Sequence, residues 1–238
     1  MASGHTVAAF DAELNALHQA IGDMGRQAER QLADAVAALV AQDQALAGAV
    51  IAQDADIDRC EQAVETMAIR LLALRQPMAR DLRDIIAALK IAGNIERIGD
   101  FASNIAKRTV AITQLPPGGV QRSLIYLAEA AGSLVRDVIK AYVDEDLELA
   151  LAVRKRDAEV DTLYSSLFRE LLTYMMESPQ LITPCTHLLF IAKNIERIGD
   201  HATNIAETIC FLIKGSAPGD ERTKEDVSSF TVIDPASP

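Results

Sequence analysis

Tryptophan is absent from this 238-residue chain, and Phe, Tyr and Trp together make up only 4% of it. Half of the residues are nevertheless hydrophobic, so aliphatic side chains and alanine must fill a sizeable core. Such a core favours closely packed helices over a β-sandwich, whose strands are rich in aromatic and β-branched residues. Glycine and proline are also few, with 12 and 8 residues. The composition therefore predicts an all-α protein.

Cysteine is scarce, and basic residues are outnumbered by acidic ones. The three cysteines, at positions 60, 185 and 210, lie in apolar stretches without metal-ligand spacing, which predicts buried, reduced thiols. The formal net charge of −11 predicts repulsion from nucleic acid and from anionic membrane. We therefore expect no nucleic-acid partner, and an acidic surface that attracts metal cations or basic proteins.

Long hydrophobic runs and targeting signals are lacking as well. No apolar run reaches the roughly 18–20 residues that span a bilayer, and the longest candidate, 181–192, is interrupted by Thr183, Pro184 and Thr186. The first five residues have neither the basic region nor the apolar segment of a signal peptide. We therefore expect a cytoplasmic protein that is peripheral to a membrane at most.

The chain does contain an internal repeat. Residues 91–106 read IAGNIERIGDFASNIA and residues 191–206 read IAKNIERIGDHATNIA, so thirteen of sixteen positions are identical at an offset of 100. A second block lies upstream at an offset of 103 and pairs Asp54 with Asp157 and Asp58 with Asp161. Two matching blocks in the same order indicate a tandem duplication.

Apolar residues in each copy recur at alternating spacings of four and three, which predicts helices that pack nearly antiparallel at about 20°. Breakers divide each copy into three helices, which in the first copy run from about 24 (or as early as 12) to 41, then to about 75, then over 81–112. We therefore expect two tandem three-helix bundles related by internal pseudo-symmetry. The predicted units are a first bundle at 1–112, a linker at 113–121, a second bundle at 122–214 and a flexible C-terminal tail at 215–238.

Acidic residues spaced four apart occur on two helices of each copy. Residues so spaced on a helix lie about 5–6 Å apart, and like charges there repel by a few tenths of a kcal/mol. A bound cation relieves that repulsion, and carboxylate oxygens suit Mg²⁺, Ca²⁺, Mn²⁺ or oxidised iron. A solvated stripe of charge, paired with neighbouring arginines, is the alternative for the same residues. The pairs are Asp54 and Asp58, Glu96 and Asp100, Asp157 and Asp161, and Glu196 and Asp200.

A helical wheel gives these pairs a direction. At about 100° per residue, Glu96 and Asp100 project roughly 140–180° from the seam of isoleucines on their helix. We therefore expect any metal on the outer face of a bundle rather than in its core. Gly99 and Gly199 lie inside the same helices, where glycine is unfavourable, so we expect each to allow close packing against a neighbouring backbone.

At these residues the chain resembles the PhoU family of phosphate-uptake regulators. The resemblance runs from about Phe10 to Gly215 and includes the segment PMARDLR at 77–83 and both Asn-Ile-Glu-Arg-Ile-Gly-Asp segments. It implies multinuclear metal clusters, with iron, zinc, manganese or magnesium as the candidate ions. The first cluster would use Asp54, Asp58, Glu96 and Asp100, and the second Asp157, Asp161, Glu196 and Asp200.

The resemblance also implies a regulatory role without enzymatic activity. The protein would regulate phosphate uptake and act as a negative regulator of phosphate-starvation signalling. Its partners would be the ATPase subunit of a phosphate ABC transporter and a sensor histidine kinase, and it would form a homodimer. His201 follows the second acidic pair and could add a nitrogen ligand, whereas the first copy has Phe101 where the family often shows His.

Two other functions deserve comparison. A carboxylate-bridged metalloenzyme of the ferritin-like type needs Glu-x-x-His on two helices, and no glutamate of this chain has histidine three residues on. A metal-free helical scaffold would leave the acidic pairs as surface charge. No phosphate-binding loop is visible either, so we expect a partner to sense phosphate and this chain to relay its state.

Overall fold

The computed structural model describes residues 2–75, 77–112, 119–216 and 219, and all of its regular elements there are helical. The first copy folds into α1 (Ala2–Ala41), α2 (Gln44–Arg75) and α3 (Arg80–Ala111). The second folds into α4 (Val120–Val143), α5 (Leu147–Glu177), the short 3₁₀ helix η1 (Pro179–Leu181) and α6 (Ile182–Lys214). The all-α prediction is confirmed.

The helix ends lie close to their predicted positions, apart from the start of the first helix. That helix begins at Ala2 rather than near residue 12, and α4 begins two residues before the predicted 122. The third helix is shifted by one residue from the predicted 81–112. Most of the predicted linker, at 113–118, and nearly all of the predicted tail, at 217–218 and 220–238, lie outside the described residues.

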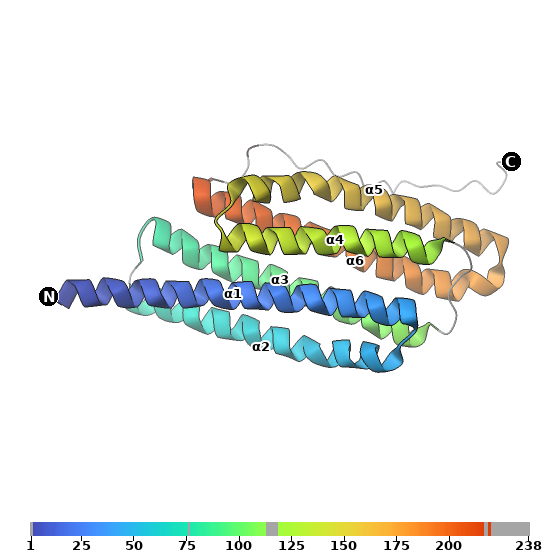
Figure 1. The fold of residues 1–238 in the computed structure, drawn as a ribbon, viewed down its shortest axis with the longest axis horizontal. Coiled ribbons are helices and arrows are strands. Elements are labelled where there is room, and N and C mark those ends of the chain that lie inside the picture. Colours follow the sequence, from blue (N-terminus) through green and yellow to red (C-terminus); the bar gives the residue numbers. More distant parts are fainter. Residues whose placement is uncertain (1, 76, 113–118, 217–218, 220–238) are drawn as a thin grey trace.

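The six helices form two three-helix bundles that lie side by side (Figure 1). Within each bundle every helix packs against the other two, and between bundles α3 packs on α6 and α1 on α4. The two central helices run antiparallel, because Lys90, early in α3, lies over the ring of Phe211, late in α6. The guanidinium of Arg108, late in α3, correspondingly lies 4.1 Å from the ring centre of Phe190, early in α6. Each central helix is therefore covered on three sides.

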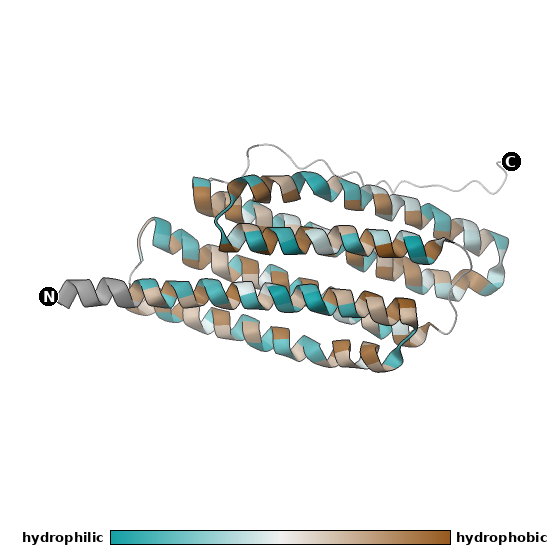
Figure 2. Cartoon of the chain, in the orientation of Figure 1, coloured by the Kyte–Doolittle hydropathy of each residue, from teal (hydrophilic) through white to brown (hydrophobic). Residues whose placement is uncertain are grey.

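The core is aliphatic, as the composition predicts. The predicted seam of α3 is fully buried, and within the described residues Tyr142 and Tyr164 are the only aromatic side chains in the buried core. Figure 2 shows polar and apolar residues alternating along the helices, as expected for amphipathic helices with one polar face. None of the described helices has the length and apolar character needed to cross a membrane.

The cysteines are free thiols, but they are not equally buried. Cys185 and Cys210 are buried as predicted, and burial raises the pKa of both thiols. Cys60 is only half-buried, where its thiol lies 3.8 Å from the side-chain oxygen of Gln27. The prediction therefore holds for two of the three.

Glycine lets the third helix of each bundle approach the second closely. A Cβ atom at Gly99 would lie 2.8 Å from Cδ1 of Ile57, and one at Gly199 would lie 3.3 Å from Cγ1 of Val160. Ile57 and Val160 are equivalent positions of the repeat, at the offset of 103. The same close approach therefore occurs in both bundles. Close packing at the two glycines is confirmed, but the atoms they meet belong to side chains and not to the expected neighbouring backbone.

Replacing Gly99 by alanine tests this contact. Because the added methyl group must displace Ile57, we expect Gly99→Ala to lower the free energy of unfolding by about 1–3 kcal/mol in a urea titration. Gly48→Ala is the matched control, since Gly48 is exposed in α2 with nothing within 4 Å of an added Cβ. Helix propensity should raise the stability of that control by up to about 1 kcal/mol. Equal effects of the two changes would contradict the close-packing role.

Candidate functional site

The first acidic set, Asp54, Asp58, Glu96 and Asp100, lies along the packed pair α2 and α3. The side chain of Glu96 is 18% exposed. Its pKa is raised to about 7, first by burial and then by the charge of Asp100, with Asp58 adding to the effect. The structure therefore brings Asp58, Glu96 and Asp100 close enough for their charges to interact.

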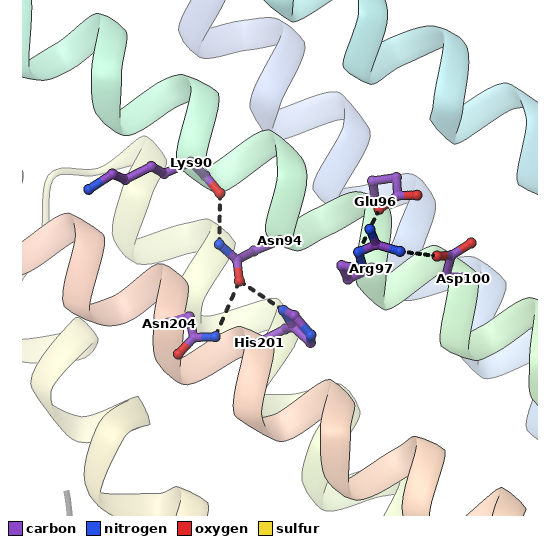
Figure 3. Close-up of polar contacts among 7 residues, drawn as sticks. All are labelled: Lys90, Asn94, Glu96, Arg97, Asp100, His201 and Asn204. Atoms are coloured by element: carbon purple, nitrogen blue, oxygen red, sulfur yellow. Dashed lines mark hydrogen bonds and ion pairs between the residues drawn. The ribbon is translucent and has the colours of Figure 1, made fainter.

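Arginine and lysine side chains partly neutralise this first set. Arg97 donates a hydrogen bond of 2.9 Å to Asp100, and its Nε lies 3.4 Å from Oε2 of Glu96 (Figure 3). Nζ of Lys107 lies 3.9 Å from Oδ2 of Asp54. Arg97 is 59% exposed, and ion pairs of this kind contribute at most about 1 kcal/mol each. The pair between Arg97 and Asp100 is one that the solvated-stripe alternative predicts.

Glu61 belongs to the same region and was not among the predicted ligands. Its pKa is raised, first by burial, and Asp58 and Asp100 contribute while Arg97 opposes them. Its position could be read from the sequence, because it follows Asp58 by three residues and Asp54 by seven and so shares their helix face. Comparison of the two copies hid it, since the equivalent residue in the second copy is Tyr164.

The second acidic set, Asp157, Asp161, Glu196 and Asp200, is placed differently. Asp157, Asp161 and Glu196 are only 2%, 2% and 3% exposed, so the predicted outer-face position is wrong for these three. The wheel took one seam as the only inward direction, whereas α6 is covered by α3, α4 and α5 together. Asp157 and Asp161 belong to α5, which packs on both α4 and α6. A position far from the seam on such a helix still meets a neighbouring helix.

The buried Glu196 has a lysine partner. Nζ of Lys193 lies 2.8 Å from Oε1 of Glu196, and the same ammonium group lies 4.9 Å from the ring centre of Tyr164 on α5. A buried carboxylate is costly unless it is paired and hydrogen-bonded, and an ammonium group this close offsets that cost.

His201 faces α3, the central helix of the other bundle. Its Nδ1 lies 2.8 Å from Oδ1 of Asn94, whose amide nitrogen donates to the carbonyl oxygen of Lys90 (Figure 3). Oδ1 of Asn94 therefore accepts, and Nδ1 of His201 carries the proton. The ring also lies 5.6 Å from that of Phe101, its own counterpart in the repeat. Burial lowers the pKa of His201.

The two sets can be tested for their fit to a metal ion. Among the side chains that the structure describes, no three acidic, His or Cys groups converge closely enough to hold an ion as they stand. The first set nonetheless offers several carboxylates against Arg97 and Lys107, and the pKa of Glu96 is raised by burial and then by neighbouring carboxylates. The donors of this set are carboxylate oxygens, the ligand type that Mg²⁺, Ca²⁺ and similar hard cations take.

The titration of Glu96 gives a pH prediction. Its folded-state pKa lies above the ordinary 4.5, so the stability it contributes is present below pH 4.5 and is lost as the pH rises through 7. Glu96→Gln removes this loss. With a chelator present, we expect the variant to gain on the order of 1–2 kcal/mol relative to the unsubstituted protein between pH 4.5 and 8. Parallel stability curves over this range would contradict the assignment.

The chain is thus an all-α protein of two tandem three-helix bundles, each with paired acidic residues on its second and third helices. The sequence profile described as the PhoU domain matches residues 21–109 and 124–209, once in each bundle. The chain belongs to the PhoU family.

Relatives match over nearly their whole length. A Rhizobium meliloti protein named phosphate-specific transport system accessory protein PhoU homolog is 50% identical over 96% of this chain and 97% of its own. A protein of the same name from Caulobacter vibrioides is 48% identical, over 94% and 98% respectively.

Solved structures agree with the fold. The crystal structure of PhoU from Pseudomonas aeruginosa superposes with a TM-score of 0.83 at 37% identity, over 87% of this chain and all of that one. The crystal structure of the phosphate transport system regulatory protein PhoU from Streptococcus pneumoniae superposes with a TM-score of 0.82 at 28% identity. The match covers 88% of this chain and 99% of that one. The two-bundle architecture is therefore that of the family.

Proposed function

We propose that this chain is an accessory regulator of phosphate transport that represses phosphate-starvation signalling when phosphate is plentiful. The observation that carries the proposal is the match, over at least 94% of both chains, to relatives named as accessory proteins of phosphate-specific transport. The protein acts by binding rather than by catalysis, in keeping with names that describe accessory and regulatory proteins. It works in the cytoplasm, as a homodimer.

The proposed partners are the ATPase subunit of the phosphate ABC transporter and a sensor histidine kinase. An acidic chain with a formal charge of −11 is suited to basic protein surfaces and ill-suited to binding free phosphate. The protein therefore relays the state of a partner that senses phosphate. Its relatives' names support the transport partner, and the kinase rests on the family resemblance.

A reporter assay tests the regulatory role. In cells that lack the gene, a phosphate-starvation reporter should be active even in phosphate-rich medium, and expression of this chain should restore repression. Calorimetric titration of the purified chain with inorganic phosphate should show no tight binding. A reporter that stays repressed without the gene would contradict the regulatory role, and tight phosphate binding would contradict the relay.

Metal binding forms the second part of the proposal. The carboxylates of both acidic sets are the proposed ligands, and the cation they take is iron, zinc, manganese or magnesium. Such a cation supplies positive charge that offsets the burial and the carboxylate repulsion that raise the pKa of Glu96. The supporting observation is the crowding of Asp58, Glu61, Glu96 and Asp100 around a single exposed arginine.

Metal analysis of protein purified without chelators tests the ligands. We expect bound metal in the unsubstituted chain and a loss of at least tenfold in affinity when four carboxylates become amides, at Glu96, Asp100, Glu196 and Asp200. A control variant changes four exposed acidic residues outside both sets, at Asp11, Asp23, Glu129 and Glu148, and so alters the net charge equally. Equal metal content in the two variants would remove the site assignment and leave the fold and family in place.

A further inference from the structure

The two acidic sets differ at one pair of facing positions. In the second bundle Tyr164 of α5 faces Lys193 of α6, with the ammonium group 4.9 Å from the ring centre. The equivalent residues of the first bundle are Glu61 and Gly93, at the offsets of 103 and 100. They face each other too, because a Cβ at Gly93 would lie 3.5 Å from Oε1 of Glu61. The same place therefore holds an ammonium group in one bundle and a carboxylate in the other.

In the second bundle this ammonium group is built into the acidic set. Nζ of Lys193 is 2.8 Å from a carboxylate oxygen of Glu196, whose side chain is 3% exposed. The aromatic ring of Tyr164 also attracts the cation, because the face of a π-system is negative. Contacts with Glu196 on α6 and Tyr164 on α5 thus hold the ammonium group of Lys193 beside the buried carboxylate of Glu196.

In the first bundle the corresponding position is occupied by a carboxylate, which adds negative charge to the acidic set. Glu61 stands where the second bundle has Tyr164, and Gly93 contributes no side chain. Arg97, the cation beside this set, lies 3.4 Å from Oε2 of Glu96 and is 59% exposed. The first set is thus left with more carboxylates than cations.

We propose that Lys193 is the resident cation of the second acidic set, so that the metal binding of this chain is confined to the first. The inference rests on the metal binding proposed above and narrows its location from both acidic sets to the first. A divalent ion in the second set would have to displace the ammonium group from Glu196 or bind beside it. Either arrangement forfeits a short charge-assisted contact or adds repulsion between like charges.

Mn²⁺ binding, measured by equilibrium dialysis, separates the two sets. Glu96→Gln with Asp100→Asn should weaken Mn²⁺ binding at least tenfold, because the second set does not substitute for the first. Adding Lys193→Gln to this double variant should restore binding, now in the second bundle. Mn²⁺ binding that persists in the double variant while Lys193 is intact would overturn the proposal, and so would a failure of Lys193→Gln to restore it.

The reverse exchange tests the same idea in the first bundle. Gly93→Lys places an ammonium group opposite Glu61 and should weaken Mn²⁺ binding by the unsubstituted chain at least tenfold. Gly93→Gln is the matched control. It adds an uncharged side chain of similar length and gives the same gain in helix propensity over glycine. Equal Mn²⁺ affinity in these two variants would count against an ammonium group as the competing cation.

A measurement without metal separates this inference from the metal proposal. In a chelator, Lys193→Gln should melt about 5 °C lower than the unsubstituted protein, because Glu196 is left buried without its partner. Mn²⁺ should recover much of that loss. If no protein binds Mn²⁺, the proposed metal function fails, and a lowered melting temperature still supports Lys193 as the internal cation. An unchanged melting temperature overturns that role whether or not the first set binds metal.

Discussion

The antiparallel contact between α3 and α6 joins the two copies, and the placement of the acidic residues depends on it. Lys90 and Arg108 of α3 lie over aromatic rings of α6 at either end of this contact. Between them, His201 hydrogen-bonds to Asn94 beside a fully buried isoleucine seam. Since each of these helices also packs against both other helices of its own bundle, little of its surface is open to water. A charged residue on such a helix must either lie at the narrow open edge or bring its own counter-charge.

The two bundles meet this constraint in different ways. In the first, Glu96 keeps a raised pKa near an exposed Arg97, and the set stays acidic. In the second, the carboxylates are more deeply buried, and Lys193 is paired with Glu196. Near-identity of the repeated segment therefore does not give equal electrostatics. The differences arise at positions outside the shared Asn-Ile-Glu-Arg-Ile-Gly-Asp segment, where glycine is exchanged for lysine and glutamate for tyrosine.

Much of this architecture could be predicted from the sequence, because helical periodicity, breakers and an internal repeat are local signals. The seam from Ile91 to Ile105 is buried as predicted, and Gly99 packs closely as expected. The burial of Asp157 could not be predicted in the same way, since a wheel describes one helix and the covering of α5 and α6 depends on all their neighbours. Glu61 was not predicted, because only acidic residues present in both copies were considered as ligands and its equivalent in the second copy is Tyr164. The metal ligands and the signalling partners remain predictions.

The contact between Phe101 and His201 shows what duplication within one chain makes available. These two residues are each other's repeat equivalents and lie together where the copies meet. In a symmetric dimer of a single three-helix unit, a residue at this place would face its own copy, so only identical pairs could form there. Fusion of the two units into one chain removes that restriction. A histidine can then be matched with a phenylalanine instead of a second imidazole, and each bundle is free to diverge around the shared axis.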